Sequence, residues 1–150
     1  MKTIVVLVDF SDLSFTLMKH AHALAKAFDS HVVLLHVVPQ VPTVVDVGLA
    51  APSVMHEMTQ DQVRAETDRL NQMRDSLAKF GVNVTTRQFQ GASVEAVLEE
   101  ARTLDAELII VGSHGHGPMY DLFVGSVTRN ILRGSTCPVL VVPGSRETDA

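Results

Sequence analysis

A glycine-punctuated stretch near the end of the chain has the residue types that an anion-binding loop needs. An apolar run at 108–111 comes before it and predicts a buried strand, and residues 127–133 after it predict the start of a helix. The stretch consists of Gly112-Ser113-His114-Gly115, then nine residues, then Gly125-Ser126. Glycines let a backbone approach phosphate oxygens, and the free amides of a helix N-terminus attract negative charge. The order predicts a phosphate site, with Ser126 at the N-cap; a plain Gly-rich turn with a helix cap is the alternative.

A carboxylate stands at the end of the first apolar run. Residues 3–8 are continuously apolar and rich in β-branched side chains, which is typical of a parallel strand covered on both faces, and the run stops at Asp9. A carboxylate in this position can accept hydrogen bonds from ribose hydroxyls or help to hold a metal ion. The alternative is a turn-forming Asp that caps the next helix, where Ser11 and Asp12 are also available.

The histidines and the single cysteine are weaker candidates for a functional site. His114 and His116 form a His-x-His pair in the glycine stretch, but such residues more often face solvent or contact a phosphate than ligate a metal. A divalent metal is expected to arrive with a triphosphate and to keep much of its water shell. His20 and His22 are two residues apart in a predicted helix and cannot face each other, so we interpret them as structural. Cys137 is interpreted as a small packing residue.

The elements that must position these residues alternate between strands and helices. The predicted strands are 3–8, 31–38, 82–89, 107–111 and 138–142, and the predicted helices are 13–28, 55–80, 94–101 and 126–132. This alternation predicts one α/β domain over residues 1–150, a doubly wound (Rossmann-like) parallel sheet of five strands with four helices. Residues 39–53 carry three prolines and one glycine without a helical period. We expect part of this loop to fold over a pocket or a partner; a mobile insertion is the alternative.

Composition limits the classes of function. A length of 150 residues suits one domain, and a net charge of −5 from 12 basic and 17 acidic residues disfavours nucleic-acid binding. An acidic protein that binds a phosphate must use amides, a metal ion or local positive charge. One cysteine excludes an intrachain disulfide. The N-terminus does not resemble a signal peptide, and no stretch approaches the roughly 20 apolar residues that span a bilayer, so a cytoplasmic location without membrane contact is expected.

Several enzyme classes lack their motifs here. The sequence has no Gly-x-x-x-x-Gly-Lys-Ser/Thr phosphate loop and no Gly-x-Ser-x-Gly nucleophile elbow. No general base is clearly paired with a nucleophile, so we assign no catalytic residue. Slow ATP hydrolysis, or autophosphorylation at Ser126 or Thr128, is left open.

Gly-x-x-Gly, nine residues and Gly-Ser together resemble the nucleotide-binding signature of the universal stress protein family. The match extends to the flanking segments 110–115, 125–128 and 137–143, and the resemblance covers nearly the whole chain. It implies an ATP-binding protein that acts as a nucleotide-dependent sensor or regulator in a stress response, with Mg²⁺ carried by the phosphates. The alternatives are a slow ATPase or adenylate-processing enzyme of the same fold, and an interaction module without nucleotide.

The resemblance also assigns positions. In this resemblance, Asp9 matches the residue that contacts the nucleoside. Val37 matches the residue whose backbone recognises adenine, and Val111 would pack against the base. The full ligand-binding set is Leu7, Val8, Asp9, Val37, Val111, Gly112, His114, Gly115, Gly125, Ser126, Val127 and Thr128. The strand order is expected to be 3-2-1-4-5, which places the ligand outside the carboxyl ends of strands one and four. Asp9 and Gly125 must then share one cavity. The last strand, at residues 139–142, would pair two chains as a homodimer.

Overall fold

The computed structural model describes residues 1–38, 41–43, 54–56, 58–113 and 125–144. The strands are β1 (Thr3–Leu7), β2 (His31–Val38), β3 (Val41–Thr43), β4 (Val54–His56), β5 (Val84–Gln90), β6 (Leu108–Gly112) and β7 (Val139–Val142). The helices are α1 (Asp12–Phe28), α2 (Gln60–Ala78), α3 (Val94–Thr103) and α4 (Ser126–Gly134). Five strands form a parallel sheet in the order β5-β2-β1-β6-β7. This order is the predicted 3-2-1-4-5, and the four predicted helices are all present.

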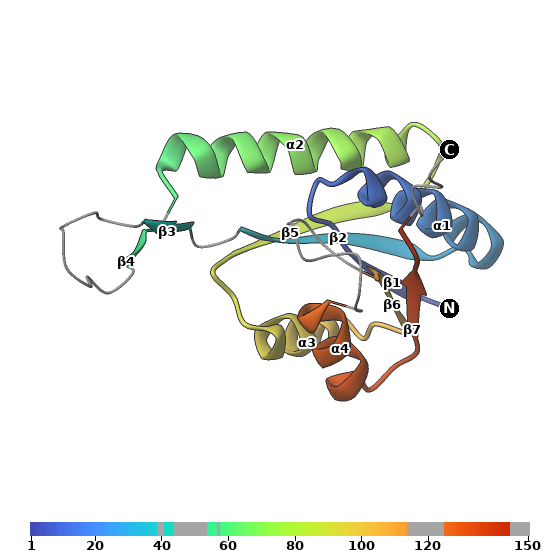
Figure 1. The fold of residues 1–150 in the computed structure, drawn as a ribbon. Coiled ribbons are helices and arrows are strands. Elements are labelled where there is room, and N and C mark those ends of the chain that lie inside the picture. Colours follow the sequence, from blue (N-terminus) through green and yellow to red (C-terminus); the bar gives the residue numbers. More distant parts are fainter. Residues whose placement is uncertain (39–40, 44–53, 57, 114–124, 145–150) are drawn as a thin grey trace, which may run out of the picture.

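Two helical layers enclose the sheet, with α1 and α2 on one face and α3 and α4 on the other (Figure 1). Alternate side chains of each central strand enter different cores. In β1, Ile4 and Val6 pack with α1 and α2, whereas Val5 packs with α3 and α4. All three are fully buried, and burying such an aliphatic side chain stabilises a fold by roughly 1.5–3 kcal/mol. The continuous apolar runs of the sequence reflect this burial on two faces.

The two edges of the sheet differ from its centre. At one edge, β5 buries none of its residues fully, which agrees with the mixture of apolar and polar residues in its sequence and is typical of an edge strand. At the other, β7 pairs with β6 and has only Val142 fully buried. Both strands are parallel to their neighbours. Within the described residues, β7 therefore keeps one side of its backbone outside the sheet.

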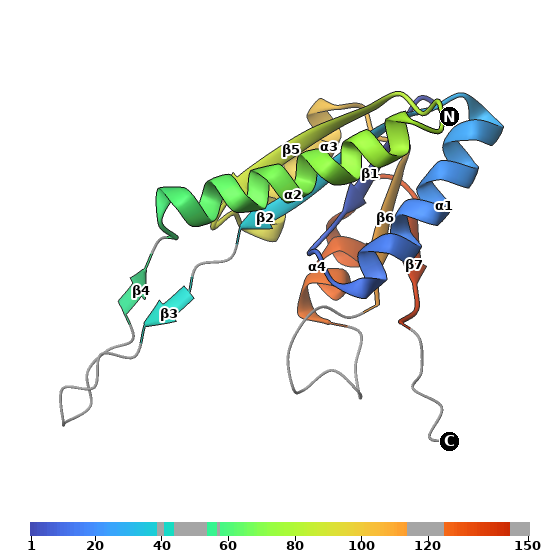
Figure 2. The same cartoon turned by 90° about the horizontal axis from the view of Figure 1, so that it is seen from above.

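The segment before α2 differs from the prediction. Residues 54–56 form β4, which pairs antiparallel with β3 as a two-stranded ribbon beyond the end of β2 (Figure 2). Residues 55 and 56 were predicted as the start of a helix. The helix begins at Gln60, because Thr59 caps it: its hydroxyl accepts a hydrogen bond from the Gln62 amide while the Gln62 side chain accepts one from the Thr59 amide. The prediction for 39–53 as a cover falls mostly outside the described residues.

Two phenylalanines lie largely outside the core, although the spacing of apolar residues in the sequence would place them on the buried faces of their helices. Phe28, at the last position of α1, is 53% exposed, and Phe80, beyond the end of α2, is 67% exposed. Both lie where a helix stops, so the 3.6-residue period no longer directs their side chains inward. Gly81 follows with a φ of 76°, a backbone conformation that glycine adopts without strain. Among the described helices, none combines the length and apolar character needed to cross a membrane.

Candidate functional site

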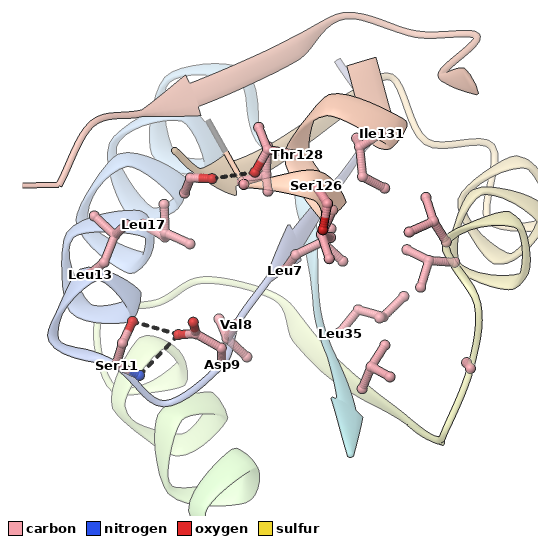
Figure 3. A pocket seen from close by; sticks show the side chains of 18 residues that line it. Leu7, Val8, Asp9, Ser11, Leu13, Leu17, Leu35, Ser126, Thr128 and Ile131 are labelled. Atoms are coloured by element: carbon pink, nitrogen blue, oxygen red, sulfur yellow. Dashed lines mark hydrogen bonds between the residues drawn. The ribbon is translucent and has the colours of Figure 1, made fainter. Parts of the chain in front are cut away.

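A cavity of about 350 Å³ opens at the carboxyl ends of β1 and β6, where the strand order reverses. Its wall combines the end of β1, the start of α1, residues of β2, the beginning of α3, the end of β6 and the first turn of α4. In a doubly wound sheet this crevice is the usual position of a ligand. Figure 3 shows Asp9 and Ser11 on one side of the cavity and Ser126 and Thr128 on another.

Asp9 follows β1 directly and is held by the turn into α1. Its Oδ1 accepts hydrogen bonds from the Ser11 amide at 3.0 Å and from the Ser11 hydroxyl (Figure 3). The same oxygen accepts a hydrogen bond from the Ser14 hydroxyl at 3.1 Å. The Asp9 amide donates to the Ser14 hydroxyl at 3.2 Å. Asp9 therefore organises the turn, as the structural alternative expected, and also lines the cavity. Ser11 is the N-cap of α1, yet its hydroxyl is directed to Asp9 and makes no capping hydrogen bond.

The first turn of α4 supplies backbone amides to the cavity. Gly125 is the N-cap and Ser126 is the first helical residue, so the expectation that Ser126 caps the helix is wrong. The cause is a shift of one position: the Gly125 amide donates to the Ser113 carbonyl, and the Gly125 carbonyl accepts from the Arg129 amide. The first amides of a helix have no intrahelical acceptor, which makes them donors to an anion. Ser126 is exposed at this end of α4, and its hydroxyl does not cap the helix.

Thr128 fastens α4 to the end of β6. Its side chain is 3% exposed, and its hydroxyl donates to the Gly112 carbonyl at 2.7 Å. Ser113 adds a second connection, because its amide donates to the Val142 carbonyl and its hydroxyl accepts from the Gly144 amide. These bonds hold both ends of the glycine stretch against the sheet. Thr128 thus shapes the site by positioning the backbone, whereas the resemblance placed it among the ligand-binding residues.

The wall of the cavity is mostly apolar. Leu35 and Val37 line it from β2, Val94 and Val97 from α3, and Ile131 from α4. Among the described residues that line it, Asp9 is the single charged one, and no Lys, Arg or His is present. An apolar wall with a few polar groups at its ends suits a flat aromatic ring attached to a polar tail.

Ten of the twelve ligand-binding residues proposed from the sequence line this cavity. They are Leu7, Val8, Asp9, Val37, Val111, Gly112, Gly125, Ser126, Val127 and Thr128. The other two, His114 and Gly115, lie outside the described residues, as does His116. Asp9 and Gly125 share the cavity, as the expected strand order requires. Their contact with a nucleotide stays a prediction.

Eight further lining residues were not identified from the sequence. They are Ser11, Leu13, Leu17, Leu35, Ala92, Val94, Val97 and Ile131. Leu35 could have been found, because it is two residues before Val37 in β2 and alternate residues of a strand share a face. Ala92 and Val94 lie where β5 connects to α3. The position of α3 on the sheet brings them to the cavity, and the local sequence does not give that position.

Comparisons with known proteins agree with this geometry. The model of the universal stress protein family matches residues 1–143, and the chain belongs to this family. One relative is universal stress protein MJ0531 of Methanocaldococcus jannaschii, 30% identical over 141 residues, which covers 94% of this chain and 81% of the relative. Another is universal stress protein YxiE of Bacillus subtilis, 30% identical over 142 residues, with 91% and 95% coverage.

Solved structures share the fold. Hypothetical protein MJ0577 superposes with a TM-score of 0.73 at 22% identity, covering 97% of this chain and 98% of its own. A universal stress protein solved in complex with cAMP gives a TM-score of 0.68 at 24% identity, with 96% and 98% coverage. The universal stress protein of Archaeoglobus fulgidus in complex with dAMP gives 0.68 at 19% identity, with 94% and 97% coverage. At these sequence identities, the similarity to the solved structures establishes that this chain shares their fold.

Proposed function

We propose that this chain is an ATP-binding universal stress protein that acts as a nucleotide-dependent sensor or regulator in a stress response. The observation that carries the proposal is the meeting of Asp9 and the first turn of α4 in one cavity at the switch point of the sheet. A carboxylate on one side and helix amides on the other suit the two polar parts of a nucleotide. That related structures hold cAMP and dAMP supports an adenine nucleotide as the ligand.

The proposed pose follows from the chemistry of the wall. The phosphates lie at the amides of residues 126–128, where the helix dipole favours negative charge. The ribose hydroxyls donate to Asp9, which is exposed in the cavity. The adenine ring packs among the apolar side chains of β2 and α3, beside Val37 and Val111. Burial of this aromatic surface provides affinity, and the polar ends provide orientation.

Magnesium would be held in this site mainly by the phosphates of the nucleotide. The described residues contain no group of three or more His, Cys, Asp or Glu side chains that could hold a metal ion. Mg²⁺ typically binds nucleotides through phosphate oxygens and retains several waters. When bound, it would offset the phosphate charge that no Lys, Arg or His of the described lining residues neutralises. The protein's own contribution is then the amides of α4.

We also propose a homodimer formed through β7. The strand lies at the edge of the sheet, and Val139, Leu140 and Val141 are each half-buried in the single chain. An apolar edge strand with unpaired backbone groups invites pairing with another chain, and a two-fold axis satisfies both copies at once. A cytoplasmic location is proposed with it, in keeping with the lone half-buried Cys137.

Calorimetric titration of the purified protein with ATP, in the presence of Mg²⁺, tests the nucleotide proposal. Saturable binding with one nucleotide per chain is expected, and mass spectrometry of the denatured protein would identify nucleotide retained through purification. Titration with GTP provides the control for the base. No ATP binding by a folded protein that has been freed of nucleotide would refute the proposal.

A further inference from the structure

We propose that His36 is a positioning residue that sets the direction of Asp9 in the nucleotide site. The inference rests on the proposed function, because it concerns the carboxylate there assigned to the ribose. His36 lies in β2, and its side chain is 4% exposed on the face of the sheet covered by α2. Its neighbours Leu35 and Val37 line the cavity from the other face. His36 therefore acts from behind the site and does not touch the ligand.

The first contact holds the residue before Asp9. The Nδ1 atom of His36 lies 2.8 Å from the Val8 carbonyl oxygen. A carbonyl only accepts hydrogen bonds, so Nδ1 must carry the hydrogen and donate it. The Val8 amide also donates to the Leu35 carbonyl at 3.0 Å. Both backbone groups of Val8 are thus engaged by β2 beyond the last residue of β1.

The second contact holds the residue after Asp9. The Phe10 ring packs on the His36 ring with centroids 4.2 Å apart and planes tilted by 44°. Arg69 of α2 covers Phe10, with its guanidinium carbon 4.6 Å from the ring centroid. Phe10 has a φ of 63°, a left-handed conformation that bulky residues rarely adopt without support. His36 thus contacts the residues on both sides of Asp9, and this reversal of the chain directs the Asp9 side chain.

Glu66 orients His36 in turn. Its Oε2 lies 2.6 Å from His36 Nε2, and the Glu66 side chain is 19% exposed in α2. Since Nδ1 already donates to Val8, a proton must also lie between Nε2 and the carboxylate for this short contact to be attractive. Glu66 and Arg69 are three residues apart and lie on the same face of α2. This face of α2 is therefore connected to the ribose side of the cavity through one imidazole ring.

A comparison of ATP with 2′,3′-dideoxy-ATP tests this inference, because the second nucleotide lacks the hydroxyls assigned to Asp9. The wild-type protein should bind ATP about tenfold more tightly than the dideoxy nucleotide, the size expected for hydrogen bonds to a charged group. In His36→Leu this preference should fall towards one while the affinity for the dideoxy nucleotide stays within about threefold of wild type. His36→Asn, whose amide can donate near the position of Nδ1, should keep an intermediate preference.

The matched control is His31→Leu, the same substitution at the opposite end of β2, which should leave the preference unchanged. Should His36→Leu fail to fold, Glu66→Ala decides instead, and its preference should fall at least about threefold. The positioning role would be overturned if the variants lost equal affinity for both nucleotides, or if folded variants kept the wild-type preference for ATP over the dideoxy nucleotide. A wild type that binds no ATP refutes the proposed function itself. A wild type that binds both nucleotides equally refutes the ribose role of Asp9 and, with it, the role of His36.

Discussion

The Thr128 hydroxyl donates a 2.7 Å hydrogen bond to the Gly112 carbonyl and thereby joins the first turn of α4 to the end of β6. Both residues line the cavity, and the side chain of Thr128 is buried. The bond spans the two ends of the glycine stretch, so the direction of the α4 amides depends on it. We infer that this bond, and not a direct contact with phosphate, is the main contribution of Thr128.

Replacing Thr128 by Val should lower both stability and nucleotide affinity. The substitution keeps the shape of the side chain but leaves the Gly112 carbonyl without its donor, which costs about 1–3 kcal/mol of unfolding free energy. Urea denaturation measures this loss, and calorimetry should show ATP binding weakened with it. Thr128→Ser retains the hydroxyl and serves as the control. Equal stability of the Val and Ser variants would show that the bond contributes nothing.

Replacing Ser126 by Asp should separate helix stability from ligand binding. A carboxylate in the first turn of a helix is favourable by about 0.3–1 kcal/mol, so the melting temperature should stay the same or rise. The same negative charge would repel the phosphates, so ATP affinity should fall by about tenfold or more. Ser126→Asn, of similar size and without charge, is the matched control and should bind ATP nearly as wild type does. Undiminished binding by the Asp variant would argue against phosphates at this end of α4.

The sequence predicted the sheet well because two-sided burial leaves a strong local signal. The apolar runs around Val5, Val33 and Ile109 are each bounded by turn residues, and each occupies a central strand. The β3–β4 ribbon was missed because its strands have three residues each and include a proline, which is too short for any period to show. The start of α2 was misplaced although Thr59 and Gln62 form a capping-box pattern in the sequence itself.

The candidate site was predictable where it depends on the ends of strands. Asp9 and Gly112 each terminate an apolar run, so parallel pairing brings them to one edge. The role of His36 was not predictable, because it depends on contacts with Val8 and Phe10 in the turn after β1 and with Glu66 in α2. Within β2, His36 is simply one polar residue in an apolar run. Its partners become apparent only when α2 packs on the sheet.

Removing Mg²⁺ should weaken ATP binding more than AMP binding. No Lys, Arg or His occurs among the described residues that line the cavity. We therefore expect the metal ion and the α4 amides to offset the triphosphate charge. Titrations with and without EDTA should show a loss of about tenfold or more for ATP and little change for AMP, which carries less charge. Equal ATP affinity with and without EDTA would indicate that the protein supplies the missing positive charge itself.

His31 should make folding stability depend on pH. Burial, with a smaller contribution from the charge of Arg87, lowers the pKa of His31 below its usual value of 6.5. The unfolded chain therefore binds a proton more readily than the folded one, and stability contributed by the neutral ring falls as the pH drops below about 6.5. This contribution to stability is fully lost once the pH lies below the pKa of His31 in the folded state. Above about pH 7 the residue should have no effect on the pH dependence.

The variant His31→Gln should remove this contribution. Urea denaturation between about pH 5 and pH 8 should show a smaller loss of unfolding free energy on acidification than in the wild type. Glutamine can still bond to the Thr85 hydroxyl, which lies 2.9 Å from His31 Nε2, so stability at neutral pH should change little. His20→Gln, on the exposed face of α1, is the control for losing a histidine. Parallel stability curves for wild type and His31→Gln would contradict the assignment.

A lysine at Val141 should break the proposed homodimer without unfolding the chain. Val141 lies in β7 at the edge of the sheet and is half-buried, so its side chain can reach water in the single chain. In a two-fold pairing of these four-residue strands, the lysines of the two chains would lie close to each other at the interface, and like charges on paired strands are destabilising. Light scattering coupled to size exclusion should give a dimer mass for the wild type and about 16.3 kDa for the variant. Val141→Thr, which favours strands and adds no charge, should remain dimeric, and a wild type that is monomeric at every concentration would exclude the β7 dimer.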